Sequence, residues 1–378
     1  MGAAGDGSAA SGSSGPRGGR WGDRLVGPAV VLVFLSLSLG PFALELATEA
    51  ALLAAALWGA REGPLLPPVI AVCVALLAST LPAGLDGGVE ALRLCWALAL
   101  LVALPPLFAR PGAAAWRPRV WSWGLGAAAL VGCGSVVELA VAWATGADLS
   151  DGGARGPFSH HLTLGYALLP PLAAALHARR FALAAPIALG ALASLGLGPA
   201  LCAALVLVSV VASPAVGLGL GLVATLALIA GLSHLDPSGE VGQRALLWTS
   251  GAEVVAAAPG GVGAGEARGA LALAQDRLQP GFHFPLHAHD SALQVGVWAG
   301  VGGWVAWAWL LVTLWRRTHR AGRAALVGVG IGALTQDTLG DLEVVRALSA
   351  WALLPLAPGW GEPAQVPVVD AEHHPVSG

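Results

Sequence analysis

Apolar positions run along this chain in long unbroken stretches of Leu, Ala and Val, separated by short intervals of Gly, Pro and charged residues. Apolar and polar positions do not alternate as they would in a half-buried strand. A helix needs about 20 apolar residues to cross the hydrocarbon core of a bilayer, and lipid offers no partner for an unpaired backbone group. The pattern predicts about twelve transmembrane helices, near 25–41, 43–59, 65–82, 90–108, 120–144, 162–178, 181–196, 198–213, 215–233, 291–315, 324–336 and 343–358. The turn within 181–213 is so short that this stretch can also be divided differently.

Composition supports an all-α polytopic membrane protein. Hydrophobic residues make up 56% of the 378 positions and charged residues 11%, with a mean hydropathy of +0.74, which is too apolar for an ordinary water-soluble domain. The net charge of −3 argues against nucleic acid as a partner, because no basic face would neutralise phosphates. The four cysteines lie in or beside apolar segments without a paired spacing, which predicts buried free thiols.

The distribution of arginine, which supplies all 19 basic residues, predicts the orientation, since cytoplasmic loops collect positive charge. With the N-terminus inside, the inner segments contain Arg17, Arg20, Arg24, Arg61, Arg110, Arg117, Arg119, Arg179, Arg180, Arg316, Arg317, Arg320 and Arg323. The outer side contains Arg93, Arg155, Arg244, Arg268, Arg277 and Arg346. These outer arginines lie against the general bias and need another reason for their position. Both termini are predicted to be cytoplasmic, and the long first apolar run favours an uncleaved first span.

The chain divides at one long polar interval in its second half. The predicted divisions are a disordered tail 1–22, a bundle of about nine spans 23–233, a periplasmic loop 234–290, a bundle of about three spans 291–358 and a disordered tail 359–378. Two helical patterns lie in the loop, over 243–257 and 266–278, with a glycine-rich segment between them. A structured loop of this length on a compact bundle is usually functional.

Charged residues also lie near the outer ends of the spans, where they would surround an outward-facing polar chamber. They are Glu45, Glu49, Arg93, Glu138, Asp337, Asp341, Glu343 and Arg346. Glu343 and Arg346 can pair, because they are three residues apart on one helix.

Histidines mark the end of the long loop, at His283, His287 and His289, followed by Asp290. Imidazole titrates near neutral pH and can take a proton from a hydroxyl, so His289 is a candidate general base, with Asp290 placed to orient its ring. Histidines four apart can also bind zinc. Pro285 interrupts a helix between the first two, and we therefore predict no metal.

Several elements resemble the bacterial O-antigen ligase and polymerase superfamily. They are His289-Asp290 followed after nine residues by Gly300 and then Gly303, and before them Arg244, Leu247-Trp248, Pro259 and Gly261-Val262-Gly263. The segment 154–166 (ARGPFSHHLTLGY) also resembles the Gly-x-Phe-Ser-His-His/Tyr-Met-Thr segment of that superfamily. Two features depart from the pattern. Asp290 stands where an amide or serine is usual, and ASLGLGPALC at 193–202 lacks the arginine that often helps to hold the diphosphate.

This resemblance implies a metal-independent, inverting membrane glycosyltransferase without a cofactor, in a bacterial inner membrane with its site facing the periplasm. The donor would be an undecaprenyl-diphosphate-linked glycan. The acceptor hydroxyl would belong to lipid A-core in a ligase, to another repeat unit in a polymerase, or to a protein in an oligosaccharyltransferase, and ligation is the expected activity. Arg244 would hold the diphosphate through its planar fork of donors, and His289 would deprotonate the acceptor.

The predicted substrate-binding residues are Arg155, His160, His161, Arg268, Arg93, Gly261, Gly263 and Gln294. Arg93, Arg155 or Arg268 would replace the missing arginine, and the glycines would let backbone N–H groups approach an anion. Structural readings remain open: Arg244 can pair with Glu240 or Glu253, the glycines can form a plain turn, and the histidines can be interfacial. A lipid or solute transporter and a non-catalytic assembly partner are alternatives of another class.

Overall fold

The computed structural model describes most of the chain as helix. It covers residues 28, 30, 32–33, 41–57, 65–80, 85–108, 113–147, 152–158, 160–231, 240–281, 288, 290–336, 338 and 341–353. Every element of regular secondary structure in these ranges is helical, which confirms the all-α class. The predicted tails 1–22 and 359–378 lie outside the described residues.

Helices lie at the predicted positions with shifts at their ends, apart from the span predicted near 25–41, most of which lies outside the described residues. They are α2 (Pro41–Leu57), α3 (Leu66–Thr80), α4 (Leu85–Phe108), α5 (Ala113–Thr145), α6 (His161–Ala167), α7 (Leu169–His177), α8 (Phe181–Ala193), α9 (Leu197–Val211), α10 (Pro214–Gly231), α11 (Glu240–Ala257), α12 (Ala264–Leu278), α13 (Ser291–Arg317), α14 (Arg320–Ala333) and α15 (Leu342–Leu353). The span predicted at 162–178 is divided at Leu168, because Pro170 and Pro171 have no N–H to continue the helical ladder.

Four helices are long and apolar enough to cross a membrane. They contain the stretches Ala91–Phe108, Trp116–Thr145, Pro214–Gly231 and Ser291–Arg317. Three shorter apolar helices, α3, α8 and α9, have 15, 13 and 15 residues. These findings support a membrane protein, and the count of twelve spans stays a prediction.

The surface of α10 supports the same conclusion. Its large apolar side chains are mostly exposed, namely Val216, Leu220, Leu222, Val223, Leu226 and Ile229. A water-soluble protein rarely exposes so continuous an apolar surface, whereas lipid solvates it.

Small residues bring the helices into close contact. A Cβ on Gly190 of α8 would lie 2.4 Å from the Cα of Gly132 on α5, and one on Gly332 of α14 would lie 2.3 Å from the ring of Tyr166 on α6. Helices that associate within lipid commonly use small residues in this way. α14 is buried along most of its length and packs on α7, α9, α10 and α15.

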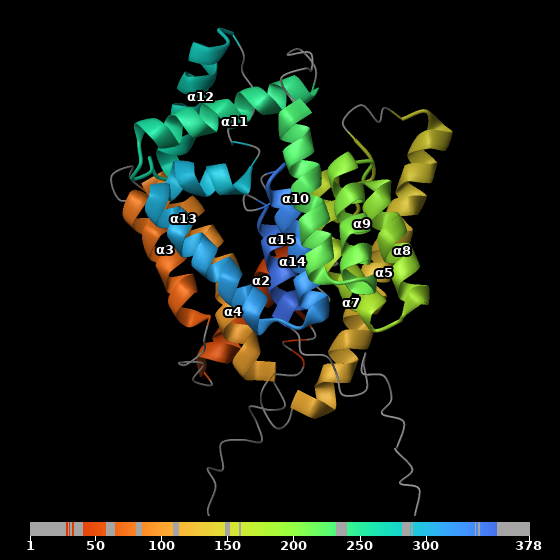
Figure 1. Ribbon diagram of the computed structural model, residues 1–378. Helices are drawn as coiled ribbons and strands as arrows, with labels where there is room; N and C mark the ends of the chain where they lie inside the picture. The colour runs from red at the N-terminus through yellow and green to blue at the C-terminus, as the bar shows by residue number, and fades with distance from the viewer. Residues whose placement is uncertain are drawn as a thin grey trace, which may run out of the picture.

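The two helical patterns predicted in the long loop are confirmed as α11 and α12. α11 lies across one end of the bundle with α12 beside it (Figure 1). The described arginines of the predicted inner set belong to the start of α5 and to the α7–α8 and α13–α14 connections, at the opposite end (Figure 1). The two arginine sets are therefore separated in space, and the side of the membrane that each end faces stays a prediction.

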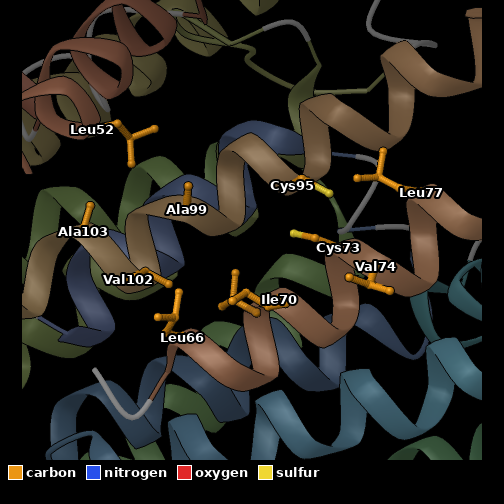
Figure 2. Close-up of a pocket in the computed structure, with 11 residues that line it drawn as sticks. Leu52, Leu66, Ile70, Cys73, Val74, Leu77, Cys95, Ala99, Val102 and Ala103 are labelled. Atoms are coloured by element: carbon orange, nitrogen blue, oxygen red, sulfur yellow. The ribbon is translucent and has the colours of Figure 1, made fainter. Parts of the chain in front are cut away.

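The cysteines are free thiols, as predicted, but only Cys202 is buried; Cys73 and Cys95 are half-buried and Cys133 is exposed. Their helices present part of their surface away from the protein core, so an apolar segment does not guarantee burial in the bundle. An apolar groove with a volume of about 360 Å³ runs between α2, α3 and α4, and the sulfur atoms of Cys73 and Cys95 point toward one another in it (Figure 2).

Candidate functional site

α13 is broken at Gly300, where φ is 60° and ψ is −152°. Residues other than glycine almost never adopt this backbone conformation. The N–H of Val301 donates to the carbonyl of Pro259 at 2.9 Å and so leaves the helical ladder. The glycine of the histidine motif thus makes a break in the helix that begins at that motif.

The carbonyls released by this break bind the glycine-rich segment between α11 and α12. Val297 accepts from the N–H of Val262 at 2.8 Å, and Trp298 accepts from the N–H of Gly263 at 2.9 Å. Together with the Val301 bond they fasten residues 259–263 to α13. We call this arrangement the 259–263 latch.

The glycines of the latch fit where a side chain would not. A Cβ on Gly261 would lie 2.5 Å from the carbonyl oxygen of Trp298, and one on Gly263 would lie 2.5 Å from that of Ser79 at the end of α3. Both have positive φ. The N–H of Gly261 donates to Ala258 at 2.8 Å. The packing reading therefore has direct structural support, and anion binding by these glycines stays a prediction.

Arg244 lies half-buried on α11, with one face of that helix toward the bundle. Its Nη1 donates to the carbonyl of Thr335 at 3.3 Å. The side chain of Tyr166 on α6 is buried close to Thr335 and Arg244. Glu253, one carboxylate considered as a partner for Arg244, lies 3.8 Å from the guanidinium of Arg277, on the exposed surface.

Asp290 is the N-cap of α13, and its Oδ1 accepts from the N–H of Leu293 at 2.9 Å. Asp and Ser are favoured at this position, because their oxygens bind N–H groups that the first helical turn leaves open. Gln294 is buried, and its Oε1 accepts from the N–H of Ala288 at 2.8 Å. The predicted base, His289, lies outside the described residues.

The connection between α14 and α15 joins the arginine and histidine motifs. Thr335 in this connection accepts from Arg244. One and three residues further on, the carbonyl of Gln336 and the hydroxyl of Thr338 each lie 3.4 Å from the hydroxyl of Ser291. The start of α13 and the first turns of α11 therefore meet on the same short segment, although they are far apart in sequence.

More polar side chains border this connection where α15 begins. The hydroxyl of Thr163 on α6 donates to the carboxylate of Asp341. Glu343 and Arg346 lie one turn apart on α15, and both are buried. Charged side chains within the apolar part of a bundle usually line a cavity or serve function. The structure thus places Asp341, Glu343 and Arg346 at the predicted polar end of the bundle.

Glu138 on α5 organises the first outer loop. Its carboxylate accepts the N–H of Arg155 at 3.1 Å and the N–H of Gly156 at 2.8 Å. Gly156 has a φ of 56°, which turns two successive N–H groups toward one anion. The Arg155 side chain is exposed at the surface of this loop.

His160 and His161 stack against each other at the start of α6, with ring centroids 4.1 Å apart. His160 is the N-cap, and its Nδ1 accepts from the N–H of Leu162 at 3.2 Å. Partial burial and the nearby Arg155 guanidinium lower the pKa of His160. The ring of His161 lies on Gly152, where a Cβ would come within 2.4 Å of it.

The remaining predicted substrate residues come from other elements. Arg93 on α4 and Arg268 on α12 are exposed, and α12 packs on α4. Which of Arg93, Arg155 and Arg268 replaces the missing arginine stays a prediction. Within the described ranges, no three His, Cys, Asp or Glu side chains gather as a metal site, and His283 and His287 lie outside those ranges.

Five polar residues at this end were not singled out from the sequence as site residues. They are Tyr166, Ser291, Thr335, Gln336 and Thr338. Two signals mark them in retrospect: Tyr166 is the one tyrosine in the chain, and the run Thr-Gln-Asp-Thr at 335–338 interrupts two apolar segments.

A search of protein-family models and a search of curated proteins find no match to this chain. The functional conclusion therefore depends on the residues themselves.

Proposed function

We propose that this chain is a membrane glycosyltransferase. It transfers a glycan from undecaprenyl diphosphate to an acceptor hydroxyl on the periplasmic side of a bacterial inner membrane, and ligation of O-antigen to lipid A-core is its expected activity. The observation that supports this proposal best is that Arg244 and Ser291, the first residue of α13 and two positions after His289 in the sequence, both contact the connection between α14 and α15.

The position of α11 and α12 also supports a reaction at a membrane surface. α11 lies across one end of the bundle with α12 beside it (Figure 1). Arg244 of α11 contacts the α14–α15 connection there, while α10 offers apolar surface to lipid. A polyprenyl chain would stay in the bilayer, and its diphosphate would reach the headgroup level, which is where this proposal puts Arg244.

In the proposed reaction, the acceptor oxygen attacks the anomeric carbon of the glycan on the face opposite the diphosphate. A new C–O bond forms, the bond from that carbon to the diphosphate oxygen breaks, and the configuration inverts. His289 takes the proton of the acceptor hydroxyl. Arg244 stabilises the negative charge that develops on the departing diphosphate, because its planar guanidinium can donate two parallel hydrogen bonds to phosphate oxygens.

Asp290 supports this step as a positioning residue. Its side chain caps α13, so it holds the backbone next to His289 in a fixed direction. The 259–263 latch fixes the same helix to the segment that follows α11, and thereby keeps the two motifs in register.

Transfer by purified protein from a lipid-linked glycan to a core acceptor tests the proposal. We expect Arg244→Ala and His289→Ala each to reduce turnover by about 10²- to 10³-fold, as for the loss of one group that stabilises a transition state. Arg244→Lys keeps the charge without the fork and should recover only part of the activity. Arg277→Ala is the matched control, because it removes an exposed arginine at the same end of the bundle.

Full activity in both Ala variants would reject the assignment of these residues. Movement of the lipid-linked glycan across proteoliposomes without transfer would identify a transporter instead. A chelator should leave transfer unchanged, and loss of activity that zinc restores would contradict a metal-independent reaction. In a deletion strain, free core with accumulated lipid-linked polymer would indicate a ligase, and single-unit caps a polymerase.

A further inference from the structure

A second pocket lies at the end of the bundle opposite α11 and α12. It has a volume of about 430 Å³ and opens where the α7–α8 connection meets the end of α9 and the start of α14. Its polar side is formed by the guanidinium groups of Arg179 and Arg320 and by the imidazole of His177, and its apolar side includes Phe181, Leu207 and Val211. None of the residues lining this pocket is acidic. We propose that it binds the phosphate headgroup of an anionic phospholipid; this proposal needs a membrane but does not depend on the glycosyltransferase assignment.

Arg179 stands at a position where the backbone favours glycine. The N–H of Arg180 donates to Ala175 at 2.9 Å and that of Arg179 to Leu176 at 3.0 Å. These two bonds form the Schellman motif that ends many helices, whose left-handed residue is usually glycine. Here that residue is Arg179, with a φ of 55°. A strained conformation retained at a cation is a pointer to function.

Arg320 is held in place beside the same pocket. Its Nη2 donates to the carbonyls of Val210 at 3.0 Å and Ala212 at 2.7 Å, at the C-terminal end of α9. The ring centroids of His177 and His319 lie 6.5 Å apart next to it. Several positive or protonatable groups thus converge on one hollow, which favours an anion with phosphate geometry.

The apolar side of the pocket favours a lipid over a soluble phosphate. Phe181 is 64% exposed, Leu207 48% and Val211 75%. These side chains would cover an acyl chain, while the cations reach its headgroup. Basic pockets between transmembrane helices bind anionic headgroups in this manner.

Thermal unfolding of the purified full-length protein in neutral detergent tests the proposal. We expect phosphatidylglycerol to raise the Tm saturably, and phosphatidylcholine or inorganic phosphate to raise it much less. Arg179→Gly is the informative variant, because it removes the cation and relieves the left-handed strain. It should raise the Tm without lipid, yet require about fivefold more phosphatidylglycerol for the same response.

Arg316→Gln is the matched control, since it removes an exposed charge at the same end of the bundle, outside the lining of the pocket, and it should respond as the wild type does. An unchanged response in Arg179→Gly, or an equal response to phosphatidylcholine, would overturn the proposal. A full response to inorganic phosphate alone would overturn the assignment to a lipid.

Discussion

Replacing Gly300 by Ala should open the 259–263 latch. An added Cβ would lie 2.1 Å from the carbonyl oxygen of Pro259 and 2.5 Å from the carbonyl carbon of Gly260, in a backbone conformation with a φ of 60°. The chain can keep the latch at a strain of about 1–3 kcal/mol. Otherwise it can straighten the helix, so that Val301 bonds again to Val297 and displaces the loop.

Straightening removes the acceptors of two loop amides, those of Val262 and Gly263. Each such bond contributes about 0.5–1.5 kcal/mol, so either response costs about 1–3 kcal/mol locally. This predicts that hydrogen exchange of the two amides accelerates by about 5- to 140-fold, since each 1.4 kcal/mol is a factor of ten. Mass spectrometry of peptides covering 258–264 in detergent measures the change.

Gly302→Ala is the control for this experiment. Gly302 lies two residues further along α13, and a Cβ there meets no atom within 4 Å. It should leave exchange in 258–264 unchanged and stabilise the helix slightly, because Ala is the better helix former. Equal exchange in the two variants would refute the view that Gly300 is required for the latch.

Three further predictions concern the polar groups at the same end. Thr163→Val should lower the stability by about 1.5–3 kcal/mol, because it removes a hydrogen bond to the Asp341 carboxylate; thermal unfolding should show Thr163→Ser near the wild type. His160 has a lowered pKa, so its neutral form is favoured in the folded state, and order in residues 152–164 should be complete above pH 6.5 and decline as the pH falls through the folded-state pKa. His160→Asn keeps a capping oxygen and should remove that pH dependence of hydrogen exchange. Glu138→Gln should speed exchange of the Arg155 and Gly156 amides, because it weakens the two bonds to the carboxylate; unchanged exchange would show that the loop is held elsewhere.

The helices could be predicted because each long apolar run must satisfy its own backbone in lipid. The span predicted at 65–82 is α3 at Leu66–Thr80, and that at 198–213 is α9 at Leu197–Val211. The division between α8 and α9 is real and takes only a few residues, with Leu195 at a φ of 52°. The number of membrane spans is harder to predict from the sequence, because several of these helices are shorter than the thickness of the bilayer core.

The break at Gly300 could not be predicted from its neighbours. It lies inside a continuous apolar run, and its cause is a contact with Pro259, about forty residues earlier in the chain. A positive φ in a helix depends on such a distant partner, which local periodicity does not contain. Gly300, which belongs to the pattern that resembles the glycosyltransferase motif, thus joins α13 to the segment after α11 in the structure.

The connection at Thr335–Thr338 was missed for a related reason. A few polar residues between two apolar runs are typical of an ordinary surface turn. Their role comes from the convergence of α6, α11 and α13 on that turn, and convergence is a property of the tertiary fold.

The exposed tryptophans along α5 suggest how the helix would be positioned across a membrane. Two tryptophans on it are exposed, Trp123 by 61% and Trp143 by 83%, and their separation along the helix is about 30 Å at 1.5 Å per residue. Tryptophan prefers the two boundaries between lipid and water, and a hydrocarbon core about 30 Å thick fits between these rings. With the tryptophans at these boundaries, Glu138 would lie about 7.5 Å inside one of them, and the backbone N–H groups that it binds at Arg155 and Gly156 would lie near the same depth.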